Sequence, residues 1–310
     1  MEAQVLDSVL TATGLTPVLL DIGCSGPALP IWQPIKQYSY LIGYDPDDRD
    51  IDRGFGEGFR QAALVQAAVC DNDRDQTMRI VLTAHPSCSS HLYPNDPVLA
   101  HYCFHEFFEV KREVQVRATS LNRTLEELRL PQIDWIKVDA QGCDLRILRN
   151  LHQDAFDRLV AVDTEPGFHE YYQTEDQFHV IHDYLINNGF WLAQLDHQRY
   201  ARTRPDTVRY LTDLVGAPSP AALLDRLGKS PTAAEARYLR TIEHVLRLPP
   251  RPRERAMLLL FAFSVLIKLP GFAADVMLAY QSVIGKDHNS ALMEQALLSL
   301  LGAPTAVSPA

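Results

Sequence analysis

The stretch that decides the fold lies at residues 18–26 and reads Val18-Leu-Leu-Asp21-Ile-Gly23-Cys-Ser-Gly26. An apolar strand here ends in an acid and leads into a glycine turn. Similar short apolar segments recur along the chain and alternate with helical patterns, which is typical of a parallel sheet covered by helices on both faces. We expect strands at residues 17–22, 40–44, 64–69, 135–138, 159–164 and 190–195. The fold class is therefore α/β, with a doubly wound, mostly parallel sheet.

Helices are expected between these strands, at residues 121–129, 144–151 and 175–188. An insert at residues 76–120 is expected to add strands at 78–82 and 113–117, and residues 207–214 are interpreted as a last, antiparallel edge strand. We expect C-terminal helices at residues 220–227, 232–246, 253–269, 272–284 and 291–301. The chain is thus expected to hold a sheet domain at residues 1–216 and an α-helical C-terminal domain at residues 217–310, which packs on the sheet or forms a homodimer interface.

The composition is that of an ordinary globular protein. The 310 residues include 29 Lys and Arg against 39 Asp and Glu, a formal net charge of −10, and 46% are hydrophobic. Such a chain can bury a core and is far from the disordered class. The acidic balance disfavours a nucleic acid or an anionic membrane surface as partner, because like charges repel.

The sequence also bears on localisation. The longest apolar run, residues 256–267, is shorter than the roughly 20 residues that span a bilayer. Five scattered cysteines do not indicate a disulfide framework, and the N-terminus lacks the features of a signal peptide. We therefore expect a cytoplasmic protein with no membrane span.

Asp21 distinguishes the glycine turn from a dinucleotide-binding loop. In the dinucleotide fold a glycine stands at this place, so that backbone N–H groups can receive a pyrophosphate. A carboxylate would repel a pyrophosphate, but it can accept hydrogen bonds from an ammonium group. S-adenosylmethionine carries an ammonium and a sulfonium and no phosphate, so the loop predicts this cofactor. The residues expected to bind it are Asp21, Gly23, Cys24, Ser25 and Gly26.

A second acid lies at the end of the next expected strand. Asp45, followed by Pro46, comes 24 residues after Asp21, and a carboxylate at this place can accept hydrogen bonds from both hydroxyls of a ribose. Asp45 would serve a nicotinamide enzyme in the same way. Asp21 therefore discriminates between the two cofactors, and it favours S-adenosylmethionine.

A longer motif in the middle of the chain resembles a known family. Residues 120–128 read Ser-Leu-Asn-Arg-Thr-Leu-Glu-Glu-Leu, and residues 133–144 read Ile-Asp-Trp-Ile-Lys-Val-Asp-Ala-Gln-Gly-Cys-Asp. This run is similar to the central motif of the FkbM family of S-adenosylmethionine-dependent methyltransferases, and the resemblance covers roughly residues 17–197. It implies a class I, Rossmann-like methyltransferase sheet and O-methylation of a hydroxyl on a sugar, a glycan or a secondary metabolite.

The resemblance also assigns residues beside the adenine. Ala68 and Val69 lie in a segment, residues 67–71, that looks like the adenine-flanking part of the family. Two positions depart from the family pattern. Gln141 stands where a glutamate is usual, and Asn122 stands near the position of a common aspartate.

Lys137 and Asp139 alternate with apolar residues at the carboxyl end of a central strand, where ligands bind in a doubly wound sheet. Methyl transfer to a hydroxyl requires that its proton be removed as charge develops. Asp139, Glu165 and His169 are candidates for the base or for holding a basic residue in place, and Lys137 takes part in catalysis or forms a structural ion pair with Asp139. Asp139 is also expected to contact the cofactor. A divalent cation held by Asp139 with Asp163 or Glu165 is possible but not expected.

Ser89, Ser90 and His91 form a polar group in the insert and are expected to bind the methyl acceptor, a small molecule or a glycan. The net charge fits a neutral acceptor better than a nucleic acid. Three alternatives stay open: a nicotinamide dehydrogenase, an RNA or protein methyltransferase, and a non-catalytic S-adenosylmethionine-binding or scaffold module whose helical domain recruits a partner.

Overall fold

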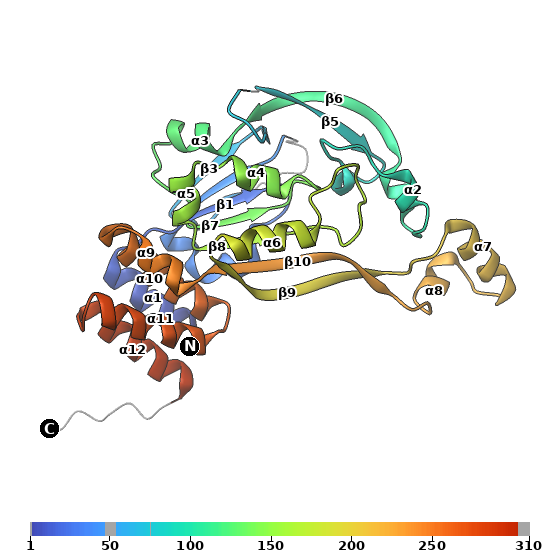
Figure 1. The fold of residues 1–310 in the computed structure, drawn as a ribbon. Coiled ribbons are helices and arrows are strands. Elements are labelled where there is room, and N and C mark those ends of the chain that lie inside the picture. The colour runs from blue at the N-terminus through green and yellow to red at the C-terminus, as the bar shows by residue number, and fades with distance from the viewer. Residues whose placement is uncertain (1, 47–53, 75, 303–310) are drawn as a thin grey trace.

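The computed structural model describes residues 2–46, 54–74 and 76–302. Its centre is a seven-stranded sheet with the order β3-β2-β1-β7-β8-β10-β9 (Figure 1). β10 is antiparallel to both of its neighbours, and the other six strands run in one direction. The strands are β1 (Val18–Ile22), β2 (Tyr40–Tyr44), β3 (Gln61–Val65), β7 (Trp135–Val138), β8 (Ala161–Thr164), β9 (Phe190–Tyr200) and β10 (Ser230–Arg240). The predicted doubly wound, mostly parallel sheet is confirmed.

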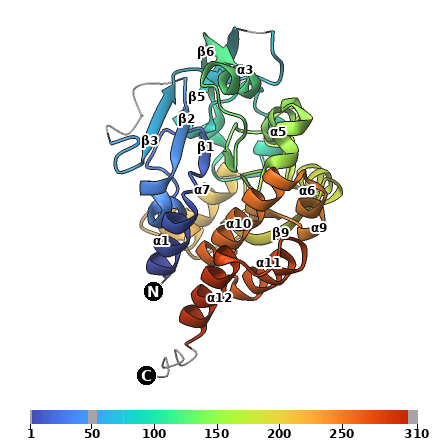
Figure 2. The same cartoon turned by 90° about the vertical axis from the view of Figure 1, so that its left-hand side faces the viewer.

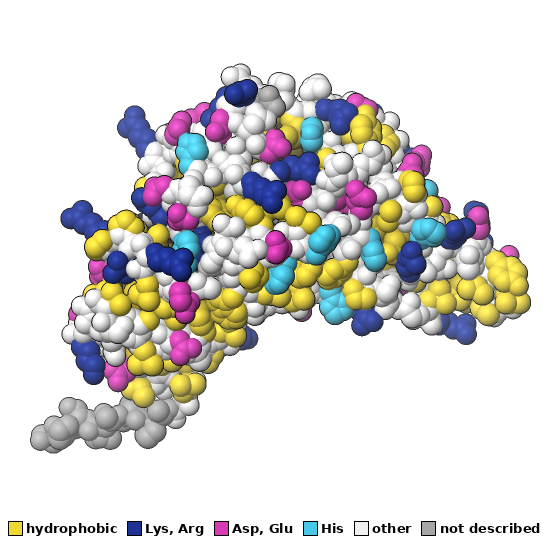
Figure 3. Space-filling model, in the orientation of Figure 1, with side chains coloured by type: hydrophobic (Ala, Val, Ile, Leu, Met, Phe, Trp, Pro, Cys, Tyr) yellow, Lys and Arg dark blue, Asp and Glu magenta, His cyan; other side chains and the backbone are white. Residues whose placement is uncertain are grey.

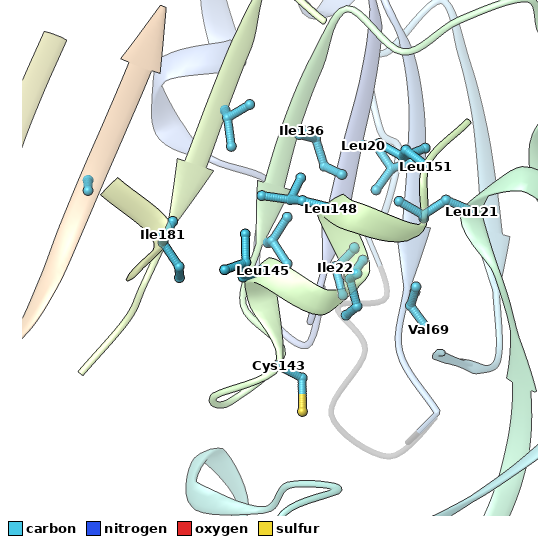
Figure 4. Packing of buried hydrophobic residues seen from close by; sticks show 14 of the residues in the cluster. Leu20, Ile22, Val69, Leu121, Ile136, Cys143, Leu145, Leu148, Leu151 and Ile181 are labelled. Carbon is cyan, nitrogen blue, oxygen red and sulfur yellow. The ribbon is translucent and has the colours of Figure 1, made fainter. Parts of the chain in front are cut away.

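Helices cover both faces of the sheet, because the side chains of each strand alternate between the two faces. On β1, Leu20 and Ile22 join one apolar cluster, whereas Leu19 joins the other. Figure 4 shows Leu20 and Ile22 in the first cluster with Leu148 of α4. The first face carries α3 (Leu121–Glu127), α4 (Asp144–Asn150), α5 (Gln153–Arg158) and α6 (Phe178–Asn187). The second face carries α1 (Glu2–Thr13), η1 (Pro30–Tyr38), α9 (Ile242–Arg247), α10 (Pro250–Leu266), α11 (Pro270–Val283) and α12 (His288–Leu301).

α10 is the centre of the second face. Every side chain at residues 256–266 is buried, so the apolar run of the sequence is core. α1 packs against both α10 and α12, and the first helix of the chain thereby joins the last ones (Figure 2). No helix within the described ranges is long and apolar enough to cross a membrane.

The insert forms a second, smaller sheet above the first. β5 (Thr77–Thr83) pairs antiparallel with β6 (Val110–Thr119), and β6 pairs with β4 (Ala68–Val69). The β5–β6 hairpin arches over the main sheet (Figure 1). Short helices η2 (Pro86–Cys88), α2 (Asp96–Leu99) and η3 (His105–Phe108) connect its two strands.

Three predicted elements were wrong. The strand expected at residues 64–69 is divided between β3 and β4, which belong to different sheets. Residues 207–214, expected as an edge strand, lie in the helix α7 (Pro205–Leu214), which has a proline in its first turn. Residues 232–246, expected as a helix, form β10 and then α9. Alanine, glutamate, arginine and leucine favour a helix there, but insertion between two strands imposes an alternating burial that overrides propensity.

The strand β10 also bears on the division of the chain. It comes from the C-terminal range 217–310, yet it pairs with β8 and β9 of the range 1–216. The two ranges thus share one sheet, and the single antiparallel strand lies one position inside the edge. β9 and β10 extend together as a ribbon that carries α7 and α8 (Pro220–Leu224) at its tip (Figure 1).

Arg240, at the end of β10, ties two helices to the sheet. Its side chain is fully buried and contacts the faces of Phe156 and Phe190. The guanidinium donates to the carbonyls of Leu159 at 2.8 Å and Asn188 at 2.6 Å, and also to that of Phe156. These carbonyls lie at the C-terminal ends of α5 and α6, where the helix provides no donors. Burial lowers the pKa of Arg240 to about 9.

We expect the substitution Arg240→Met to lower the free energy of unfolding by about 2–4 kcal/mol, because the helix-end carbonyls lose their donors while buried. Urea unfolding measures the change. The control is Arg247→Met, at an exposed position at the end of α9, with an expected change below about 0.5 kcal/mol. Equal stability of both variants would contradict this role for Arg240.

Candidate functional site

A cavity of about 740 Å³ lies between the carboxyl ends of β1, β2 and β7 and the overlying β5–β6 hairpin. The strand order reverses at this point, since the chain continues from β1 to β2 on one side and returns at β7 on the other. In doubly wound sheets ligands bind at such a reversal. The volume is that of a site for a small molecule.

Many of the predicted site residues meet at this cavity. Those that line it are Gly23, Ser25, Asp45, Pro46, Ala68, Val69, Ser89, Ser90, His91 and Asp139. Those that do not line it are Asp21, Cys24, Gly26, Lys137, Glu165 and His169. The functional roles of both groups stay predictions.

The glycine turn brings β1 close to β7. Gly23 has φ +78°, and a Cβ at this position would lie 2.7 Å from the backbone oxygen of Asp139. A larger residue is thus excluded by both conformation and space. The N–H groups of Gly23 and Cys24 donate to the carbonyl of Tyr44, at 2.9 and 3.1 Å. These two donors are committed to β2, which fits a loop that does not bind a phosphate.

Lys137 lies at the centre of a buried charge cluster. Its side chain extends from β7, which pairs with β1 so that Lys137 stands opposite Asp21. The ammonium is 3.5 Å from Asp21 Oδ1 and 3.3 Å from Asp139 Oδ2, and only 8% of the residue is exposed. It also donates to the carbonyls of Ile22 and Gly23, each at 3.4 Å. The ion pair between Lys137 and Asp139 that the sequence allowed is present.

The pKa values of Asp21 and Lys137 are both raised, but for different physical reasons. Burial raises the pKa of Asp21 to about 6, although Lys137 acts in the opposite direction. Burial alone would lower the pKa of Lys137, but the charges of Asp139, Asp21 and Glu165 outweigh it and hold the pKa above its usual value. Oδ1 of Asp21 is buried without a hydrogen bond from the described residues. A ligand ammonium could supply that missing donor.

Gln141 holds Asp139 from the other side. Its Nε2 donates to Asp139 Oδ1 at 2.6 Å, and its Oε1 lies 2.9 Å from the hydroxyl of Tyr172. Gln141 has φ +48°, a conformation that is costly for a residue other than glycine. The sequence marked Gln141 only as a departure from the family pattern, and it carried no signal for Tyr172.

Glu165 and His169, two further predicted catalytic residues, do not line the cavity, and His169 is exposed. Glu165 follows β8; burial, with help from the charge of Asp139, raises its pKa to about 8. Burial raises the pKa of Asp144 to about 7, and its carboxylate accepts the N–H groups of Ala140 and Glu165. His169 packs against Tyr102 and Tyr171.

One of the carboxylates considered as a metal ligand is already engaged by an arginine. Asp163, a candidate ligand, is held by Arg237 at 2.8 and 2.9 Å. Within the described ranges, no three His, Cys, Asp or Glu side chains are grouped so that they could bind a metal ion.

The polar group of the insert faces the loop after β7. Ser90 Oγ donates to the carbonyl of Gln141 at 2.7 Å and accepts the N–H of Leu92, so it joins the insert to the main sheet. Ser89 Oγ accepts the N–H of Thr83 at 3.2 Å. His91 Nδ1 lies 3.0 Å from the carbonyl of Arg79. Ser89, Ser90 and His91 therefore also have a structural role, because they make polar contacts with the backbone.

We expect Asp21→Asn to raise the free energy of unfolding at pH 8 by on the order of 2 kcal/mol. Burial disfavours ionised Asp21, so its contribution to stability is lost as the pH rises from about 4 through about 6, and a neutral amide avoids this loss. Below about pH 4 the difference should vanish. Urea unfolding at both pH values measures it, with Asp213→Asn on the exposed side of α7 as the control. A variant less stable than the parent at pH 8 would contradict the argument.

Comparison with solved structures gives matches of low similarity. A candidate RNA methyltransferase from Pyrococcus horikoshii is 10% identical, with a TM-score of 0.30 over 78% of this chain and 82% of that one. A structure described as an antibiotic-related methyltransferase is 12% identical, with a TM-score of 0.27 over 77% of this chain and 94% of that one. No curated protein matches the sequence.

The comparison with family models gives a match described as the methyltransferase FkbM domain, at residues 51–192. The matched range contains Lys137, Asp139 and Gln141, as well as the β5–β6 hairpin. The glycine turn and Asp45 precede it, so the cavity joins matched and unmatched parts of the chain. The predicted resemblance is confirmed by this match to the FkbM methyltransferase domain at residues 51–192.

Proposed function

We propose that the protein is an S-adenosylmethionine-dependent methyltransferase that methylates a hydroxyl of a small molecule or glycan. The supporting observation is the cavity at the reversal of strand order, where Asp45 and Asp139 line the ends of β2 and β7. Asp21 and Lys137 do not line it, but Lys137 forms ion pairs with both Asp21 and Asp139. Among these four residues three carboxylates stand against one ammonium, so this side of the cavity favours a ligand group with positive charge.

The residues present fit the proposed cofactor. Asp21 Oδ1 is buried and has the Lys137 ammonium at 3.5 Å but no hydrogen bond among the described residues, which suits a second ammonium. Asp45 suits the ribose hydroxyls, and Ala68 and Val69 give an apolar wall for an adenine. The turn at Gly23 leaves no side chain between the ligand and the backbone. When bound, S-adenosylmethionine supplies an electrophilic methyl group on a sulfonium.

Asp139 is the residue we propose for proton removal. Of the four predicted catalytic residues, all within the described ranges, Asp139 lines the cavity and the others do not. Hydrogen bonds from Gln141 and Lys137 fix its orientation, and each carboxylate oxygen keeps a lone pair for an acceptor hydroxyl. Lys137 is then a positioning residue.

The cellular location and the oligomeric state of the protein are also part of the proposal. We place the protein in the cytoplasm, since no disulfide bond joins cysteines among the described residues and a reducing compartment keeps thiols in that state. Exposed Leu278, Leu298 and Leu301 lie on α11 and α12, where Figure 3 shows hydrophobic side chains gathered at the lower left. They support the predicted homodimer through the C-terminal helices. The RNA or protein methyltransferase and the scaffold module stay as alternatives.

We expect Asp45→Asn to weaken S-adenosylmethionine binding at least about tenfold, because a charged hydrogen-bond acceptor for the ribose is lost. Isothermal titration calorimetry measures the affinity, and Asp213→Asn serves as the matched control far along the chain on α7. Binding of a nicotinamide dinucleotide in place of S-adenosylmethionine would overturn the proposed cofactor.

We expect Asp139→Asn to lower methyl transfer by about 10²- to 10⁴-fold, the usual contribution of a general base. Transfer of labelled methyl groups to a panel of sugars, glycans and nucleotide sugars measures it, with and without Mg²⁺. Asp213→Asn, at an exposed position of α7 outside the cavity lining, is the control. Unchanged transfer by Asp139→Asn would remove Asp139 from the mechanism, and no transfer by the parent to any acceptor would favour the scaffold alternative.

A further inference from the structure

The cavity has walls of opposite charge. Asp45 and Asp139 line it from the main sheet, whereas Lys111 and Arg112 line it from β6 of the overlying hairpin. The chain as a whole is acidic, with a formal net charge of −10. Two neighbouring cations at one wall of this cavity therefore stand out against the acidic character of the chain.

A bulge in β6 brings both cations to this wall. Leu82 of β5 pairs with Arg112, and Thr83 pairs with Val110, so Lys111 is an extra residue on β6. In a regular strand successive side chains point to opposite faces, and one of two neighbours would point away from the cavity. A bulge sets two residues opposite one and redirects their side chains. Lys111 and Arg112 consequently both line the cavity.

Neither cation is committed to a strong structural contact. Lys111 Nζ lies 2.8 Å from Glu109 Oε2, but their side chains are 50% and 65% exposed, and ion pairs in such contact with water are weak. The side chain of Arg112 has no hydrogen bond or ion pair within the described residues. Arg146, which also lines the cavity, shows the contrast, because it is fixed by hydrogen bonds to Asp176 and Thr174.

Further donors lie at the same end of the hairpin. His85, Ser87 and Ser89 follow the end of β5 and line the cavity. The hydroxyl of Ser87 lies 2.8 Å from His85 Nδ1. Hydroxyl and imidazole groups beside two cations are suited to the oxygens of a phosphate or a carboxylate.

Lys111 and Arg112 lie far from Ala68 and Val69, which are predicted to contact the adenine. β4, with Ala68 and Val69, pairs with β6 at Ala118 and Thr119. Arg112 comes six residues before Ala118 on the same strand, a separation of roughly 20 Å along an extended chain. Met78, Ile80 and Leu82 line the cavity between the two ends. S-adenosylmethionine has a carboxylate of its own, but this group stands on the same carbon as the ammonium that we place at Asp21 on β1. An anion held by Lys111 and Arg112 on the hairpin is therefore assigned to the acceptor.

We propose that the methyl acceptor carries an anionic group, a phosphate or a carboxylate, which Lys111 and Arg112 bind. This inference rests on the proposed methyltransferase function and replaces the neutral acceptor expected from net charge. The opposite charges of the walls orient the acceptor. Its anion is attracted to the hairpin and repelled by Asp45 and Asp139, so the neutral part with the hydroxyl faces the sheet.

The test is calorimetry with small anions on the full chain. Glucose 1-phosphate and glucuronate probe the two anions, glucose is the neutral counterpart, and inorganic phosphate tests the anion alone. Each is titrated into the protein with and without S-adenosylhomocysteine. We expect at least one of the two sugar anions to bind at least tenfold more tightly than glucose, and which one does so distinguishes phosphate from carboxylate.

Substitutions then locate the binding. Lys111→Ser and Arg112→Ser should each weaken binding of that anion at least tenfold and leave the affinity for S-adenosylhomocysteine unchanged. Arg117→Ser, on the same strand but outside the cavity lining, is matched in charge and should change neither. Thermal unfolding of all three variants checks that they fold.

The outcomes separate this inference from the proposed function. Failure of any anion to bind better than glucose, or equal anion binding by the parent and both variants, overturns the anionic acceptor even when S-adenosylhomocysteine binds. Absence of S-adenosylhomocysteine binding overturns the proposed function. The anion titrations without S-adenosylhomocysteine then still test whether Lys111 and Arg112 bind an anion.

Discussion

The site depends on the ion pairs that the buried ammonium of Lys137 makes at the ends of β1 and β7. A cation with 8% of its residue exposed is costly unless carboxylates stand beside it, and Asp21 and Asp139 do so at 3.5 and 3.3 Å. The same cation offsets the electrostatic repulsion between the carboxylates of Asp21 and Asp139. Because the three groups carry one positive and two negative charges, the cluster keeps a net negative charge that can attract a cationic ligand.

The sheet makes this arrangement possible. Asp21 and Lys137 are paired positions on adjacent parallel strands, so their side chains leave the sheet on the same face. Gly23 then allows the turn after β1 to touch the backbone of Asp139. Buried Arg240 and the packing of α10 hold the layers on each side. The site is thus set by rigid strands, whereas the opposite wall of the cavity comes from an inserted hairpin.

The sequence predicted best those features that depend on local chemistry. The strands β2 and β7 have the predicted bounds, and Asp45 and Asp139 follow them into one cavity. Features set by distant contacts were not predictable in this way. The helix-like composition of residues 232–240 gave no sign that two strands would take them up as β10, and the bulge at Lys111 depends on its pairing with Leu82 and Thr83.

A glutamine at position 141, where the family usually has a glutamate, follows from the charges of the neighbouring side chains. Its side chain lies 2.6 Å from Asp139, so a glutamate in the same position would bring two carboxylates into contact. Lys137 already serves Asp21 and Asp139, and a third carboxylate would need a proton to remain there. The amide instead donates a hydrogen bond and adds no charge. Asp139 is therefore held by a hydrogen-bond donor at each oxygen, Gln141 at Oδ1 and Lys137 at Oδ2, without a further carboxylate beside it.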